Sequence, residues 1–103
     1  MKSCKFHPEA EIRIAEIWRF TYQQWGEEQA DKYTLNINDS VQRLCAGELI
    51  GRNYNHLKKY SIKFISCQRH FIFYTEGPDN IFILTVLHDV MDLPIRLKDI
   101  LEE

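Results

Sequence analysis

The residues best suited to chemistry form a run of basic side chains between positions 52 and 70. Acidic side chains gather elsewhere, in the first third of the chain and at its C-terminus, so this run stands out although the formal net charge is −2. Such a cluster can contact phosphate groups or an acidic partner. The alternative is a solvated sheet edge whose lysines block aggregation. The basic cluster comprises Arg52, His56, Lys58, Lys59, Lys63, Arg69 and His70.

The basic cluster leads into two runs that predict a β-hairpin. Residues 69–75 and 81–88 are rich in β-branched and aromatic side chains, and a Gly-Pro-Asp-Asn turn at 77–80 separates them. A half-buried strand of alternating polarity is expected at 60–66, so the three strands form an antiparallel meander. Alternation divides the middle strand into two faces, with Arg69, Phe71, Phe73 and Thr75 on one and His70, Ile72 and Tyr74 on the other.

Two amphipathic helices are predicted before this sheet. The first is expected from about Pro8 to Trp25 and the second from about Glu27 to Ala46, because apolar residues recur at three- and four-residue steps. Gly26 and Gly47 stand where each helix should end, and His7 takes the cap site of the first, for which it is a weak choice. Helices joined so closely fold back as an antiparallel hairpin whose apolar stripes cover the sheet. The apolar stripe of the first helix, which runs from Ala10 to Trp25, is expected to be core. The side chains expected to pack on the sheet are Trp18, Tyr22, Ile37 and Leu44.

These elements predict an α+β fold. An N-terminal antiparallel two-helix hairpin packs on a small antiparallel sheet of three to four strands, and Pro94 opens a short C-terminal helix with apolar Ile95, Leu97, Ile100 and Leu101. A chain of 103 residues suits a single domain spanning residues 1–103. If the helices cover the face that carries Ile72, then His70 and Tyr74 are core or rim residues with a satisfied polar tip.

Composition narrows the classes of protein further. No apolar run approaches the roughly 18 residues that a spanning helix needs, and the N-terminus lacks an apolar secretion signal, so a cytoplasmic location without membrane contact is expected. The cysteines Cys4, Cys45 and Cys67 are odd in number and have no close pair. This spacing argues against a disulfide framework and against a zinc site, so we expect reduced thiols. The sequence indicates no cofactor and no metal.

Several segments together resemble the RelE/ParE toxin superfamily over most of the chain. They are Glu16-Ile17-Trp18 with Trp25-Gly26, Ile50-Gly51-Arg52, Arg69-His70-Phe71-Ile72-Phe73-Tyr74, and Val86-Leu87-His88 with Met91-Asp92-Leu93. The chain is most similar to the ParE-type branch. The resemblance implies a toxin of a type II toxin–antitoxin pair, held inactive by a cognate antitoxin. A disordered antitoxin segment would fold on contact, at the strand from Tyr60 to Ile65 or in the groove between helices and sheet.

Three functions follow from the resemblance. ParE-type toxins poison DNA gyrase by binding, which needs a complementary surface and no active site. We expect this function, with a target-binding set of Arg52, Lys58, Lys59, Lys63 and Arg69. One alternative is a RelE-type mRNA interferase acting on the ribosome. Another is a non-toxic module that only binds its antitoxin.

The mRNA interferase alternative makes a separate demand on the residues. RNA cleavage needs a base for the ribose 2′-hydroxyl, an acid for the leaving 5′-oxygen and cations for the phosphorane charge. The nuclease set is Arg69, His88, Tyr74 and Lys63. Against it, His88 could simply orient the following turn, and Thr75-Glu76 stand where the family often carries arginine.

Overall fold

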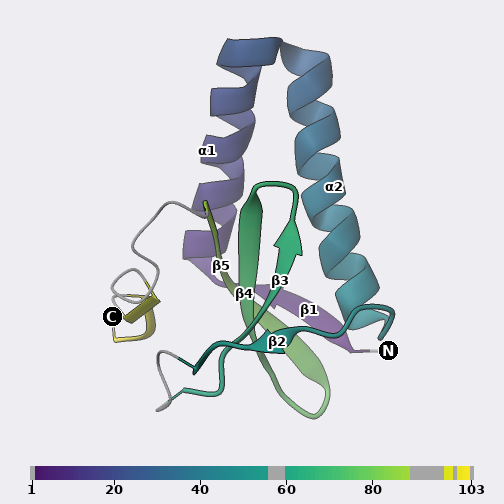
Figure 1. The fold of residues 1–103 in the computed structure, drawn as a ribbon, viewed down its shortest axis with the longest axis vertical. Coiled ribbons are helices and arrows are strands. Elements are labelled where there is room, and N and C mark those ends of the chain that lie inside the picture. The colour runs from purple at the N-terminus through teal and green to yellow at the C-terminus, as the bar shows by residue number, and fades with distance from the viewer. Residues whose placement is uncertain (1, 56–59, 89–96, 99, 103) are drawn as a thin grey trace.

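The computed structural model describes residues 2–55, 60–88, 97–98 and 100–102. Within these residues a two-helix hairpin lies against one mixed five-stranded sheet (Figure 1). This arrangement confirms the predicted α+β fold. The elements are β1 (Ser3–Phe6), α1 (Pro8–Trp25), α2 (Glu27–Cys45), β2 (Arg52–Asn53), β3 (Lys63–Cys67), β4 (His70–Glu76) and β5 (Asn80–His88).

The helical hairpin has the predicted boundaries to within one residue. α1 begins at Pro8, where His7 does act as the cap: its Nδ1 accepts a hydrogen bond from the Glu9 backbone N–H at 3.0 Å. Gly26 adopts a φ of +94° between the helices, a left-handed value that glycine adopts without strain. Gly47, with a φ of +83°, follows the end of α2. Local sequence signals therefore specify this part of the fold.

Only the lower half of the hairpin packs on the sheet, since the helices reach well past the end of the strands (Figure 1). Ile37 and Leu44 are buried as predicted. The prediction that Trp18 and Tyr22 pack on the sheet is wrong. Trp18 Nε1 donates to Asp31 Oδ1 across the hairpin at 2.8 Å, and its ring stacks on that of Tyr22, which is 49% exposed. A helix of this length spans about 27 Å, so its distal turns lie beyond any strand.

The sheet extends the predicted meander by a strand at each edge, in the order β1-β5-β4-β3-β2. β3, β4 and β5 are antiparallel, as predicted. β1 pairs with β5 in parallel, from Ser3 opposite Asn80 to Phe6 opposite Ile83, and was not predicted. Four residues are too few to show a periodicity, so only the distant pairing makes this segment a strand.

Each face of the sheet carries its own hydrophobic cluster. Ile72 and Tyr74 of β4 face the helices with Ile83 and Val86, against Ala10, Ile37, Val41 and Leu44. Phe73 faces the opposite side with Ile62, Leu84, Leu87 and Leu97. A bulge between Phe73 and Tyr74 shifts the register with β5. Residues 97–98 and 100–101 are helical and Leu97 is buried, as predicted for the C-terminal helix, whereas Pro94 and Ile95 lie outside the described residues.

Thr85 in β5 carries a buried hydroxyl that has no partner among the described residues. Thr85 is 0% exposed, and its Oγ1 forms no hydrogen bond with any residue that the structure describes. An unsatisfied buried hydroxyl carries a desolvation penalty, so Thr85→Val is expected to raise the free energy of unfolding by about 1 kcal/mol. Urea unfolding checks this. Thr21→Val is the matched control, because Thr21 Oγ1 donates to the Ile17 carbonyl at 2.7 Å, and it should bring no gain.

The cysteine prediction is wrong for two of the thiols. Cys4 in β1 and Cys45 at the end of α2 are joined by a disulfide, while Cys67 is free and buried. The Lys2 backbone N–H also donates to the Cys45 carbonyl at 3.0 Å. The pair is far apart in sequence, and only the unpredicted pairing of β1 with β5 places Cys4 beside the helix.

Candidate functional site

The four candidates for RNA cleavage divide between the two ends of β4. His88 pairs with His70 at the start of β4, beside Arg69, whereas Lys63 pairs with Tyr74 near its end. Four residues along a strand span about 13 Å. The two pairs also line separate cavities, one with Arg69 and His88 and another with Lys63 and Tyr74. The described residues therefore do not bring a base, an acid and two cations to one phosphate.

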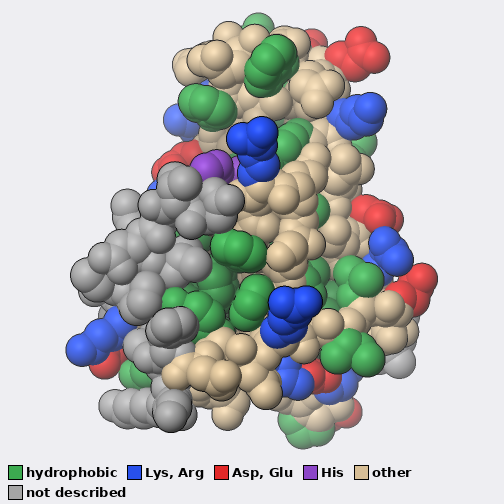
Figure 2. Space-filling model, viewed as in Figure 1, with side chains coloured by type: hydrophobic (Ala, Val, Ile, Leu, Met, Phe, Trp, Pro, Cys, Tyr) green, Lys and Arg blue, Asp and Glu red, His purple; other side chains and the backbone are tan. Residues whose placement is uncertain are grey.

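The larger cavity is an open groove between the hairpin and the start of β4, with a volume of about 790 Å³. Two of its aromatic residues are largely exposed, Phe20 by 63% and Trp25 by 72%. Figure 2 shows hydrophobic side chains near the free end of the hairpin and a histidine beside basic side chains below them. The groove is lined by Arg13, Glu16, Ile17, Phe20, Thr21, Trp25, Gln29, Tyr33, Arg69, His70, Val86 and His88.

Hydrogen bonds and ring contacts hold the polar floor of this groove. Tyr33 Oη and His70 Nδ1 lie 2.8 Å apart, and the rings of His70 and His88 meet edge to face at 5.2 Å. Burial raises the pKa of Tyr33, opposed by a hydrogen bond from the Arg69 backbone, so Tyr33 keeps its proton at neutral pH. The prediction that His70 has a satisfied polar tip is confirmed. Arg69 forms no ion pair with any described residue, which leaves its charge available to a partner.

The second cavity, of about 300 Å³, lies at the other end of β4 below α2. Tyr74 is 1% exposed and its hydroxyl hydrogen-bonds the backbone of Gly51, which confirms the prediction of a core residue with a satisfied tip. Burial raises the pKa of Tyr74 despite nearby Lys63, so this phenol is a poor acid.

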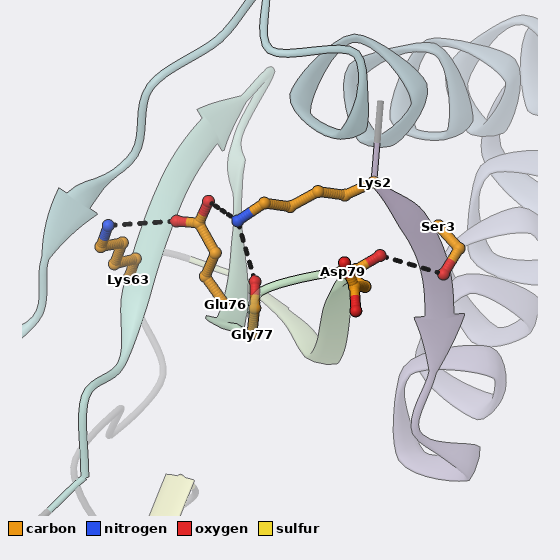
Figure 3. A network of polar contacts seen from close by, with 6 residues as sticks. All are labelled: Lys2, Ser3, Lys63, Glu76, Gly77 and Asp79. Atoms are coloured by element: carbon orange, nitrogen blue, oxygen red, sulfur yellow. Dashed lines mark hydrogen bonds and ion pairs between the residues drawn. The ribbon is translucent and has the colours of Figure 1, made fainter.

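Lys63 is paired and not a free cation. Its Nζ donates to Glu76 Oε1 at 3.2 Å, while Lys2 Nζ donates to Glu76 Oε2 at 2.6 Å and to the Gly77 carbonyl at 2.8 Å (Figure 3). Glu76 thus neutralises one of the two lysines. No local sequence signal predicts this network, because its three ionised groups come from separate parts of the chain.

The Glu76 network predicts a pH dependence of stability. Hydrogen bonds from Lys2 and Lys63 hold the pKa of Glu76 below its ordinary value of 4.5. A carboxyl with a lowered folded pKa adds stability above its unfolded pKa and loses it as the pH falls through the folded pKa. We expect wild type to be more stable than Glu76→Gln at neutral pH, and the difference to vanish below that folded pKa. Urea unfolding at several pH values measures it, and a difference that persists in acid would contradict the assignment.

The other predicted target-binding residues lie apart from both cavities or outside the described residues. Arg52 is exposed on β2, opposite Phe64 of β3. Lys58 and Lys59 lie outside the described residues. The described side chains include no group of three or more His, Cys, Asp or Glu placed to hold a metal ion. Nor is any helix among the described residues long and apolar enough to cross a membrane.

Sequence reasoning missed Phe20 and misread Trp25 as a core residue. Both continue the helical spacing of the buried stripe, so periodicity alone cannot separate them from the core. The available signal is length, since a helix longer than its supporting strands must expose its last apolar turns. Together with Arg69, these side chains make the groove a surface suited to a partner with apolar and acidic groups.

Known proteins resemble the chain in sequence and fold. The family described as ParE toxin of type II toxin-antitoxin system, parDE, matches residues 4–93. Toxin ParE1 of Mycobacterium tuberculosis (strain CDC 1551 / Oshkosh) is 32% identical over 91 residues, which cover 87% of this chain and 92% of the relative. Toxin ParE of Escherichia coli is 30% identical over 92 residues, covering 88% of each chain.

A solved structure shares the fold. A chain described as the chromosomal ParDE TA system from P. aeruginosa superposes with a TM-score of 0.70 and 19% identity, covering 85% of this chain and 96% of that one. The family match extends over most of the chain, from β1 through β5. This protein therefore belongs to the family of ParE toxins of type II toxin–antitoxin systems.

Proposed function

We propose that this ParE toxin acts in the cytoplasm by binding DNA gyrase, and that a cognate antitoxin neutralises it. The observation that carries the choice of binding over catalysis is the division of the nuclease candidates between the two ends of β4. Gyrase as the target follows from the resemblance to the ParE branch. Poisoning by binding needs only a complementary surface.

The individual residues also favour binding over RNA cleavage. A general acid must reach the leaving oxygen, yet Tyr74 is 1% exposed and its hydroxyl is engaged by Gly51. Lys63 shares Glu76 with Lys2 and so contributes little free positive charge. Arg69 is the candidate whose charge no described residue neutralises, and it lines a groove rich in exposed aromatic surface.

A gyrase assay tests the target. Purified toxin should block DNA supercoiling by gyrase and leave linear DNA, and RNA incubated with toxin and ribosomes should stay intact. Arg69→Ala should weaken gyrase inhibition by about tenfold, which corresponds to one lost charged contact of about 1.4 kcal/mol. Lys98→Ala, an exposed lysine away from the groove, is the control. RNA cleavage that Arg69→Ala abolishes would instead support the interferase alternative.

We infer from the apolar lining of the large groove that the antitoxin binds there. A segment that folds on binding buries apolar side chains against exposed aromatic anchors and sets acidic groups opposite a free cation. Phe20 and Trp25 supply such anchors and Arg69 the cation. Toxicity that appears only when the antitoxin is absent would support neutralisation, and growth unaffected by toxin alone would favour the non-toxic module.

Removing the aromatic anchors should weaken antitoxin binding strongly. Phe20→Ala/Trp25→Ala is expected to raise the dissociation constant at least 30-fold, because buried aromatic anchors contribute about 2 kcal/mol or more. Isothermal titration calorimetry with the purified antitoxin measures this. Ile12→Ala is the matched control, since Ile12 is 52% exposed on the same helix but does not line the groove. Equal affinities for the double variant and wild type would mean that the antitoxin binds another surface of the toxin.

A further inference from the structure

The N-terminal strand β1 is a short element at the edge of the sheet. It pairs over four residues with β5. At its ends, the Ser3 backbone N–H donates to the Asp79 carbonyl at 3.1 Å and the His7 backbone N–H to the Ile83 carbonyl at 2.8 Å. Figure 3 shows Lys2 reaching from the start of the strand to Glu76 and Gly77. Such a short edge strand opens easily unless a further contact secures it.

That further contact is covalent. The disulfide joins Cys4, in the middle of β1, to Cys45, the last residue of α2. We propose that the Cys4–Cys45 bond is a redox latch: oxidised, it holds β1 over the edge of β5, and reduced, it lets β1 open. The third cysteine takes no part, because Cys67 is buried in β3 with its thiol near Ser40 and the Asn36 carbonyl.

The proposed location gives the latch its role as a switch. In the cytoplasm, which is part of the proposed function, thiol reductants keep most cysteines reduced, and the disulfides that do form there are usually transient and redox-sensing. The bond between β1 and α2 forms or breaks according to the balance between thiol reductants and oxidants. Its reduction changes how one edge of the sheet is held without touching the large groove.

The surroundings of the two sulfurs suit reduction by a dithiol protein of the thioredoxin class. Cys4 is partly exposed, while Cys45 is 3% exposed and borders the smaller cavity with Lys2 and Lys63. A thiolate of the reductant attacks Cys4 Sγ, the disulfide bond breaks, and Cys45 leaves as a thiolate that then takes up a proton. The second thiol of the reductant then attacks the mixed disulfide and releases Cys4.

The reaction is balanced by the reductant alone. Two electrons pass to the cysteine pair, the reductant becomes a disulfide, and the two protons of its thiols end on Cys4 and Cys45 by way of water. In the reduced protein β1 is held by hydrogen bonds, by the packing of Cys4 and Phe6 on the core and by the Lys2 ion pair, but no longer by a covalent bond. Opening of β1 then uncovers the edge of β5, which presents unpaired N–H and C=O groups to a partner strand.

Hydrogen exchange on the full chain tests the latch. Exchange of amides in β1 and in β4 is followed by mass spectrometry before and after treatment with dithiothreitol, without denaturant. We expect the ratio of the β1 rate to the β4 rate to rise at least tenfold on reduction. A ratio that stays constant means that reduction only lowers global stability, and a bond that dithiothreitol leaves intact means a structural staple. Either result overturns the proposal.

Two variants and one measurement in cells complete the test. Cys4→Ser should show the high exchange ratio with and without reductant, while Cys67→Ala should respond as wild type does. In cells quenched with acid and treated with a thiol label, the pair should be reduced during growth and bridged after the oxidant diamide. A pair that is bridged in both conditions overturns the proposal. None of these readouts depends on gyrase inhibition, so each proposal can fail alone.

Discussion

Gly51→Ala is expected to lower the free energy of unfolding by about 3 kcal/mol, the upper end of the cost of overpacking a core. A Cβ added at Gly51 would overlap the Tyr74 hydroxyl and lie 2.8 Å from Tyr74 Cε1 and from Cζ. Tyr74 cannot move aside, because it is 1% exposed between the sheet and the helices. If the loop moved instead, it would break the hydrogen bond between the Tyr74 hydroxyl and the Gly51 backbone. Either response lowers the melting temperature, by roughly 10 °C or more.

Two further variants show whether the contact with Tyr74 is the cause. Gly51→Ala/Tyr74→Phe removes the atom that overlaps most, so it should recover part of the lost stability, although two ring carbons still crowd the new methyl group. Gly77→Ala is the matched control: its nearest neighbour is Asn80 Oδ1 at 3.1 Å, the end of a side chain that can rotate away. If Gly51→Ala has the same melting temperature as wild type, the loop tolerates displacement and the close approach of Gly51 to Tyr74 has no structural role.

The helices and the meander could be predicted because their signals are local. The three- and four-residue steps of α1 and α2, the glycines after them and the turn at 77–80 each lie within one element or beside it. β1 gives no such signal. Ser3–Phe6 becomes a strand only by pairing with β5, and the disulfide between Cys4 and Cys45 follows from that pairing. Both therefore lay beyond prediction from sequence pattern.

The candidate site was predictable only in part, for a related reason. Strand alternation correctly grouped Tyr74 and His70 on one face of β4, the structure shows that the helices cover this face, and each side chain has a partner there. Alternation does not say how far the helices extend past the sheet, so Trp25 looked like a core residue. Charge counting likewise made Lys63 a free cation, although Glu76 and Lys2 meet it in the fold. Residues from distant segments of the chain pair with some of the predicted side chains, and only the side chains that stay unpaired are available to bind another molecule.

Loss of the disulfide should destabilise the fold strongly. Cys4 and Cys45 are separated by 41 positions. By the chain-entropy relation, closing a loop of that size costs the unfolded chain entropy equivalent to about 4 kcal/mol at 25 °C, within the 2–5 kcal/mol measured for native disulfides. Cys4→Ser is therefore expected to lower the free energy of unfolding by about 4 kcal/mol, measured by urea unfolding of the oxidised protein.

The expected loss is a large share of the stability of the fold, since domains of this size are stable by about 5–15 kcal/mol. Cys4→Ser/Cys45→Ser should match Cys4→Ser closely, because the first change already opens the loop. Dithiothreitol should destabilise wild type as much as Cys4→Ser does and leave both variants unchanged. If wild type and Cys4→Ser unfold at the same urea concentration, hydrogen bonds and packing alone hold β1 in place. Reduction of the disulfide would then not change the free energy of unfolding. A partner that binds the folded reduced toxin would restore part of the loss by mass action.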